Sequence, residues 1–289
     1  MEWYIFALLS AVFSSFLPII NKKVLKKVSL MDFSAVYSIL TFLFSLSFLS
    51  LVKITFDLKV IFLIFLGSVF STLGFYAINK AIKRSAVSLV SPLRSFNPVV
   101  LLIMSMFLLG DKINASNIVG IAFIVLGAYV IEARDMLHKP LEPLKRMLKS
   151  SLLFLIMSSA IFYAVSSIID KVVLSFYDIF GFFVLIHLFI ALNFFVINIL
   201  ETRRLPWNGH IKSSFSLIIL ASVVTIFSRI FLLQSISLGI VSLVIAIKHT
   251  DTLIATTIGG EIFHEKHLKK KIAAAFIMLV GVMFVILKP

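Results

Sequence analysis

Two long apolar runs that share an internal pattern determine the fold of this chain. Residues 85–109 read SAVSLVSPLRSFNPVVLLIMSMFLL, and residues 240–263 read IVSLVIAIKHTDTLIATTIGGEIF. A helix needs about 20 apolar residues to cross the hydrocarbon core of a bilayer, so each run is long enough to be a membrane span. Both runs contain Val-Ser-Leu-Val near their start and a cation a few residues later, Arg94 in the first and Lys248 in the second. The two spans are therefore expected to be related.

The rest of the chain has the same apolar character. Its 289 residues are 61% hydrophobic and only 14% charged, and the mean hydropathy of +1.12 exceeds that of soluble domains. The spans lack the strict alternation of a membrane β-barrel, which leaves an all-α integral membrane protein. We expect ten transmembrane helices, near residues 3–20, 31–52, 58–79, 85–109, 115–131, 150–170, 179–200, 213–235, 240–263 and 271–287. The first run has no basic segment before it and is expected to be retained as a span.

The two halves of the chain match each other in order and spacing. At a constant offset of 154 residues, Arg94 pairs with Lys248, Asn97 with Asp251, Asp111 with Glu265, Lys112 with Lys266, and Gly127 with Gly281. Earlier in each half, Ile19-Ile20-Asn21-Lys22 matches Ile168-Ile169-Asp170-Lys171. The repetition predicts a first five-helix repeat at 1–131, a cytoplasmic linker at 132–149 and a second repeat at 150–289. Because five is odd, the second repeat is expected to be inverted in the membrane.

Lys and Arg are distributed unevenly between the expected loops. Of the 27 basic residues, 19 fall in the loops after the first, third, fifth, seventh and ninth helices, and 5 fall in the other loops and the C-terminal end. The positive-inside rule then places the odd-numbered loops in the cytoplasm and both termini on the extracytoplasmic side of the cell membrane. Basic membrane flanks also account for the net charge of +14, so nucleic-acid binding is not expected.

Each half closes with the same three features in order: the end of its fourth helix, rich in leucine or glycine, then a short acidic-basic turn, and then a final helix that contains glycine. The stretches are Phe107-Leu108-Leu109-Gly110-Asp111-Lys112-Ile113 with Gly120 and Gly127, and Gly260-Glu261-Ile262-Phe263-His264-Glu265-Lys266 with Gly281. The chain resembles, over nearly its whole length, the EamA-type transporters of the drug/metabolite transporter superfamily. It departs from their usual pattern at Asp111, where Glu is usual, and in the ninth helix, which has no proline. The resemblance implies a ten-helix secondary carrier that works by alternating access without ATP, and it leaves the substrate open.

Three cations, Arg94, Arg229 and Lys248, are expected inside the spans. A cation costs roughly 3 kcal/mol near the bilayer centre, so these side chains should face the interior of the bundle. Lys248 shares a helix face with Asp251, as Arg94 does with Asn97. If Asp251 neutralises one cation, two remain for the carboxylate or phosphate of a substrate. We therefore expect an anionic or zwitterionic metabolite between Arg94 and Lys248 near the midplane. The resemblance points the same way, since phosphorylated-sugar translocators of the superfamily use basic residues in helices 4 and 9.

Other side chains near these cations are candidates for supporting roles. Tyr76 could line the same cavity. Asp251 or His249 could carry a coupling proton, since an imidazole titrates near pH 6.5. Pro92 and Pro98 each remove a backbone hydrogen bond and are expected to kink the fourth helix, either as part of a gate or as a static bend.

Alternative interpretations of the same residues stay open. Arg94 could bond to carbonyl groups freed by the prolines and Lys248 could simply pair with Asp251; the chain would then export neutral or amphipathic compounds such as amino acids or drugs. An intramembrane hydrolase is a remote alternative, because no nucleophile elbow or Walker loop occurs in the sequence. His264 and His267 lack the spacing of a zinc-binding pair, so neither a metal nor a cofactor is expected. The expected partners are a small-molecule substrate and membrane lipid, with a homo-oligomer possible.

Overall fold

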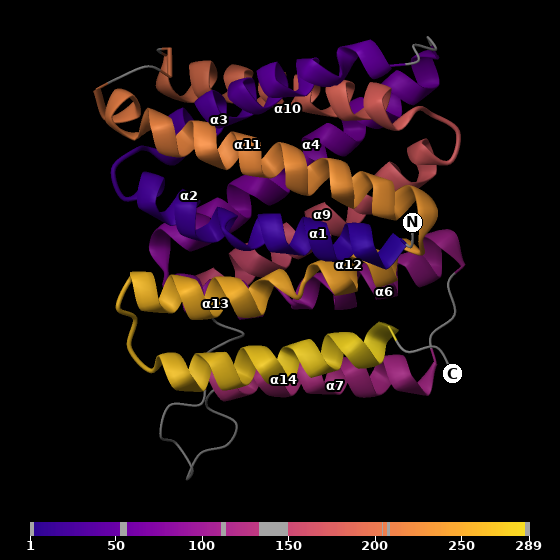
Figure 1. Ribbon diagram of the computed structural model, residues 1–289, viewed down its shortest axis with the longest axis vertical. Coiled ribbons are helices and arrows are strands. Elements are labelled where there is room, and N and C mark those ends of the chain that lie inside the picture. Colours follow the sequence, from indigo (N-terminus) through magenta and orange to yellow (C-terminus); the bar gives the residue numbers. More distant parts are fainter. Residues whose placement is uncertain are drawn as a thin grey trace.

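The described part of the chain is built from helices (Figure 1). The computed structural model describes residues 3–52, 57–110, 114–132, 150–203, 205–206 and 209–286. Its elements are α1 (Trp3–Ser15), α2 (Leu17–Leu25), α3 (Leu30–Ser45), the 3₁₀ segment η1 (Leu46–Leu51), α4 (Leu58–Arg84), α5 (Val87–Leu93), α6 (Phe96–Leu109), α7 (Ala115–Glu132), α9 (Ser151–Leu174), α10 (Ile179–Thr202), α11 (Gly209–Leu238), α12 (Val241–Lys248), α13 (Asp251–Ile262) and α14 (Leu268–Ile286). Eight helical segments are long and apolar enough to cross a membrane, and α7 and α14 occupy the other two expected spans. The expected all-α membrane fold is confirmed.

Two spans of the first half are interrupted near a proline. α1 ends at Ser15, and α2 begins at Leu17 with Pro18 in its first turn. α5 and α6 are separated at Arg94, which lies between the two prolines of the fourth span. The N–H of Asn97 donates to the Arg94 carbonyl oxygen at 2.9 Å. This tight turn supplies the carbonyl with a partner that Pro98, which has no N–H, cannot provide.

The ninth span is interrupted without a proline. α12 ends at Lys248 and α13 begins at Asp251, with His249 and Thr250 between them. The N–H of Thr250 donates to the carbonyl oxygen of Ile247 at 3.0 Å, an i to i−3 bond that tightens the helix by part of a turn. Both broken spans thus change direction at matching places in the two halves.

The most extensive contacts between helices join opposite halves of the chain (Figure 1). α1 packs against α11, α4 against α9, α3 against α10, and α7 against α14. The first two pairs are equivalent, since each joins the first span of one half to the third span of the other. α7 and α14 form one edge of the molecule. α1 begins and α14 ends on the same side of the view, as an even number of crossings requires.

α7 and α14 approach each other through small residues at matching positions. A Cβ atom on Gly281 would lie 2.6 Å from the carbonyl oxygen of Gly120, and a Cβ atom on Gly127 would lie 2.9 Å from that of Ala274. Gly120 and Ala274 are 154 residues apart, as are the other two. The two helices therefore meet at equivalent points, where only small side chains allow so short a distance.

A lysine closes the C-terminal end of the third span in each half. Lys22 Nζ donates to the carbonyl oxygens of Ile82 and Ser85 at 2.6 and 2.7 Å. Lys171 Nζ donates to the carbonyl oxygens of Ile236 and Gly239, at 2.9 Å in both cases. These two residues lie 154 positions after Ile82 and Ser85. A positive charge at this position satisfies carbonyl groups that have no partner within the helix and complements its dipole. The matching motifs seen in the sequence thus do the same structural work twice.

Two of the sequence predictions fall on positions that the structure leaves undescribed. Residues 133–149 of the expected linker 132–149 lie outside the described residues, and so do Asp111 and Lys112 of the first acidic-basic turn.

Candidate substrate cavity

A cavity of about 230 Å³ lies inside the bundle and is lined by both halves of the chain. Its polar lining consists of Ser14, Asn21, Tyr37, Ser38, Thr41, Ser71, Asn79, Arg94, Asn97, Ser159, Tyr163, Ser167, His187, Thr225, Ser228, Arg229, Lys248 and His249. Aliphatic and aromatic side chains such as Phe75, Ile156 and Phe194 complete the wall. Apolar walls with a few polar groups are typical of sites for small organic molecules.

The three helix breaks border this cavity. Pro18 lies beside the break between α1 and α2, Arg94 lies at the break between α5 and α6, and His249 lies at the break between α12 and α13; all three line the cavity. Non-helical backbone at membrane depth is tolerated only against protein or a water-filled space. The breaks therefore place backbone polar groups that lack helical partners beside the cavity.

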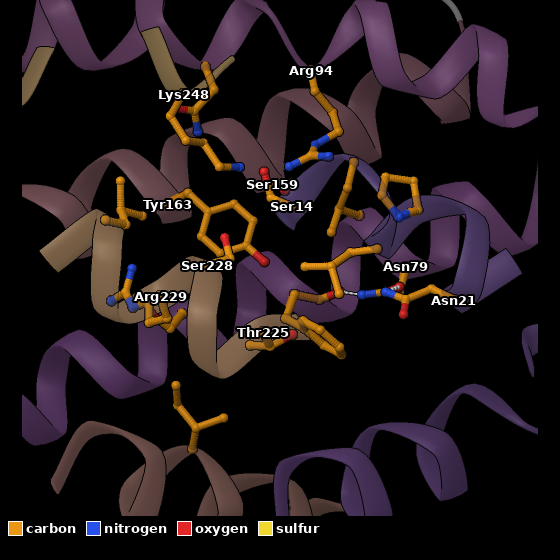
Figure 2. Close-up of a pocket in the computed structure, with 18 of the residues that line it drawn as sticks. Ser14, Asn21, Asn79, Arg94, Ser159, Tyr163, Thr225, Ser228, Arg229 and Lys248 are labelled. Carbon is orange, nitrogen blue, oxygen red and sulfur yellow. Dashed lines mark hydrogen bonds between the residues drawn. The ribbon is translucent and has the colours of Figure 1, made fainter. Parts of the chain in front are cut away.

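Arg94 and Lys248 are brought together at this cavity. Figure 2 shows their charged ends pointing toward each other, with Ser14 and Ser159 close by. Lys248 Nζ forms a salt bridge of 3.0 Å with Asp251 Oδ2, and the Ser14 hydroxyl donates to the same carboxylate oxygen at 2.7 Å. Asp251 itself is 1% exposed and is not among the lining residues.

Arg94 differs from Lys248 in its partners. Within the described part of the chain, its guanidinium makes neither a hydrogen bond nor a salt bridge, and the residue is only partly buried. Asp251 is already paired with Lys248, so only one carboxylate is set against the two cations in this part of the described wall. The described cavity wall between them carries one net positive charge.

Arg229 lines the cavity but does not join this pair. It forms a salt bridge of 2.6 Å with Asp170, whose side chain is fully buried, and in Figure 2 its guanidinium points away from Arg94 and Lys248. The sequence argument paired only one cation, through Asp251, and left two for a substrate. The structure corrects the number of unpaired cations from two to one, because Asp170 neutralises Arg229 and Asp251 neutralises Lys248. Arg94 is then the one cation of the three without an ion-pair partner among the described residues.

A second set of polar side chains, all of them neutral, lines another part of the cavity wall. The Asn21 side-chain amide donates to Asn79 Oδ1 at 2.9 Å, and the Asn79 amide donates to the Phe75 carbonyl oxygen at 2.9 Å. The Tyr37 hydroxyl lies 2.5 Å from the hydroxyl of Thr225. These neutral groups come from α2, α3, α4 and α11 and contrast with the cationic pair.

The other predicted site residues are placed as follows. Asn97 lines the cavity and donates to the Ala160 carbonyl oxygen at 3.4 Å. His249 also lines it, is 5% exposed, and has no hydrogen-bond partner at Nδ1 among the described residues.

Tyr76 is not among the lining residues. Lys80 Nζ donates to its hydroxyl at 3.3 Å and lies over its ring. Phe75 and Asn79, four residues apart, share the cavity face of α4. Tyr76 points elsewhere, because adjacent helical residues are separated by about 100°.

Sequence reasoning missed several groups at the site, among them Ser14, Asn21, Tyr163 and, as the partner of Arg229, Asp170. Asn21 and Asp170 occupy matching positions in the repeated Ile-Ile-Asn/Asp-Lys motif. A polar residue repeated at the end of an apolar span was a signal that could have marked both. Nothing comparable distinguishes Ser14 or Tyr163 from the other serines and tyrosines in the spans.

Comparison with known proteins finds a family match in the first half and a shared fold over nearly the whole chain. Residues 1–133 match the model of the EamA-like transporter family. A solved structure titled "Crystal structure of protein" is similar over 98% of this chain and 95% of its own length, with a TM-score of 0.70 and 11% sequence identity, so the shared fold extends through both halves. No curated protein matches the sequence.

The chain is thus a multi-pass membrane transporter. Its residues 1–133 match the EamA-like transporter family, which confirms in that half the resemblance carried by the sequence motifs. The match is to a family of transporters, as the leading interpretation of the sequence expected.

Proposed function

We propose that this chain is a secondary transporter for a small organic anion or zwitterion, which binds between Arg94 and Lys248 and crosses by alternating access. The observation that carries the proposal is the Arg94 guanidinium, which faces a cavity at membrane depth without an ion-pair partner among the described residues. A cation in that position costs roughly 3 kcal/mol. A carboxylate or phosphate that forms two parallel hydrogen bonds with the guanidinium would offset this cost.

Lys248 supplies the second contact to the anion. Its ammonium carries three donors and spends one of them on Asp251 at 3.0 Å. The remaining donors can reach a ligand that lies between Lys248 and Arg94. With one net positive charge in this part of the wall, one negative charge on the ligand is balanced. Asp251 and His249 stay candidates for a coupling proton.

Support for two inverted repeats comes from contacts that occur as matching pairs, either one within each half or two equivalent contacts between the halves. The Lys22 and Lys171 caps, the α1–α11 and α4–α9 pairs and the glycine contacts between α7 and α14 are related by the same sequence offsets. We infer that residues 1–131 and 150–289 are the two repeats. Relative movement of such repeats would expose a cavity between them to each side in turn.

A contact between the halves closes one end of the cavity in this proposal. Glu265, in the turn between α13 and α14, accepts from the N–H groups of Val87 and Ser88 at 2.8 and 3.0 Å, where α5 begins. The Ser88 hydroxyl also donates to it, and Lys271 lies 3.5 Å away. This contact has to break for α5 to separate from α13. By the positive-inside argument, this face is the cytoplasmic one and both termini are extracytoplasmic.

The second candidate is an exporter of neutral or amphipathic compounds. Apolar side chains in the wall, such as Ile78, Ile190 and Leu232, favour it. In that case Arg94 would serve the structure and would not contact the substrate, so the same variants separate the two functions.

Ligand-induced stabilisation followed by flux in proteoliposomes tests the anion site. Purified protein is screened with inorganic phosphate, phosphorylated sugars, carboxylates and amino acids, because a bound ligand raises the melting temperature by mass action. We expect Arg94→Gln to abolish stabilisation by the best anion and its flux, while the unliganded melting temperature is kept. Arg84→Gln, an exposed arginine at the end of α4, is the matched control. Undiminished anion binding and flux in Arg94→Gln would overturn the proposal.

A further inference from the structure

The neutral part of the cavity wall contains an amide whose orientation is fixed. The Asn79 amide nitrogen donates to the Phe75 carbonyl oxygen at 2.9 Å, which turns Asn79 Oδ1 toward Asn21. An oxygen can only accept, so Asn21 must present its NH₂ group to Asn79 at 2.9 Å. These two hydrogen bonds therefore direct the side-chain nitrogen of Asn21 toward Asn79 and its side-chain oxygen away from Asn79.

That oxygen has no donor. Asn21 is 4% exposed and lines the cavity, and its Oδ1 is buried without a hydrogen-bond partner among the described residues. Buried polar atoms are nearly always hydrogen-bonded, so an orphaned acceptor in a cavity wall indicates a missing partner. The matching residue of the second half, Asp170, differs in this respect, because its carboxylate forms a salt bridge with Arg229.

The space between Asn21 and the cations is bordered by aromatic groups. In Figure 2 the Tyr163 ring lies between the Lys248 side and the Thr225 side of the cavity, with its hydroxyl directed toward the interior. Tyr37 and Phe75 are stacked with ring centroids 5.0 Å apart, and both line the cavity. A ligand bound there would have an anionic group at one end, a short apolar middle against the rings and a polar group at the other end.

We propose that Asn21 Oδ1 is a second recognition point and accepts a hydrogen bond from the substrate. The substrate is then a small anion that carries a hydroxyl or ammonium donor at the end remote from its phosphate or carboxylate. A simple alkyl phosphate or alkyl carboxylate would leave the acceptor unpaired. This inference rests on the proposed anion site at Arg94 and Lys248, and it narrows that site to hydroxylated or amino-substituted anions.

Matched ligand pairs test the donor requirement. Propyl phosphate is compared with glycerol 3-phosphate, ethyl phosphate with phosphoethanolamine, and propionate with 3-aminopropionate, each by the concentration that raises the melting temperature of the purified protein. In the wild-type protein we expect the donor-bearing member of at least one pair to bind about tenfold more tightly, as one hydrogen bond to a buried acceptor implies.

The variant Asn21→Leu removes the acceptor and keeps the side-chain volume. We expect it to abolish the preference within the pair while the alkyl member binds as well as before. Asn193→Leu is the matched control, since Asn193 is not among the lining residues and its amide already donates to the hydroxyls of Ser68 and Thr72 at 3.1 and 3.3 Å, and it should keep the preference. If Asn21→Leu does not fold, the wild-type preference and the same comparison in Asn21→Ser, whose shorter side chain withdraws the oxygen, decide the question.

The two proposals fail in distinguishable ways. Binding of anions that depends on Arg94, with no preference for donors in any pair, would overturn the donor site alone. A preference that persists in Asn21→Leu would do the same. Absence of binding by every anion tested, or binding that is independent of Arg94, would overturn the anion site and with it this inference.

Discussion

The first spans of the two halves end in the same motif but use its polar residue in different ways. In both, the lysine caps the third span of its own half, Lys22 through Ser85 and Lys171 through Gly239. The residue before it is Asn21 in the first half and Asp170 in the second. Asn21 lines the cavity and its Oδ1 has no partner among the described residues. Asp170 is not among the lining residues, and its Oδ2 forms a salt bridge with Arg229 at 2.6 Å. The repeated unit keeps its scaffold contacts and differs in the groups that face the cavity. A cavity between two halves with matching contacts need not, therefore, be symmetric.

The largest effect is expected when the second half is made like the first. Asp170→Asn leaves the Arg229 guanidinium in the bundle without its carboxylate, and removing one partner of a buried ion pair costs about 3 kcal/mol. We expect a clearly lower melting temperature and a lower free energy of unfolding in detergent. The double variant Asp170→Asn with Arg229→Gln should recover most of the loss, because two neutral amides can hydrogen-bond to each other. A double variant as unstable as the single one would contradict the pairing.

A smaller effect is expected where the halves agree. Lys22→Met and Lys171→Met keep the apolar stem of the side chain and remove the ammonium that caps α4 or α11. Loss of a charged donor to helix carbonyl groups costs about 1–2 kcal/mol, and the cost should be similar for the two variants because the contacts match. Chemical unfolding measures both, with Lys23→Met as a control, since Lys23 lies next to Lys22 but is exposed. A cost confined to one of the two caps would break the equivalence of the halves.

The shared features could be predicted from the sequence because they depend on composition and spacing. Apolarity over about 20 residues located the spans, and the cost of a cation in lipid placed Arg94 and Lys248 inside the bundle before any contact was known. The matching motifs also indicated a duplicated unit. These arguments need no knowledge of which helices pack together.

The differences between the halves could not be predicted, because they depend on which helices pack together and in which orientation. The Asp170–Arg229 and Asn21–Asn79 contacts join separate helices, so they depend on how each helix is rotated about its axis. Spans that are apolar on most of their surface carry a weak signal of that rotation. The break after Lys248 is a shift from i−4 to i−3 bonding without a proline, and such a shift has no residue signature.

The smallest effect on stability concerns the starts of α5 and α12, which match in sequence and differ in capping. Glu265 accepts from the N–H groups at the start of α5, whereas α12 begins after Ile240 without a side-chain cap. Glu265→Gln removes the charge but keeps a hydrogen-bonding group, so we expect a loss of about 1 kcal/mol or less. If the contact closes one end of the cavity, accessibility should change far more than stability.

Cysteine labelling measures that accessibility, because the natural chain has no cysteine to interfere. Ile82 lines the cavity near the end of α4 that lies beside this contact. We expect Ile82→Cys to react several-fold faster with a membrane-impermeant thiol reagent, applied from the face of the basic loops, when Glu265→Gln is also present. Glu261→Gln, an exposed carboxylate one turn earlier, should leave the rate unchanged. Equal labelling rates in the Glu265→Gln and Glu261→Gln backgrounds would mean that the contact stabilises the turn without controlling entry to the cavity.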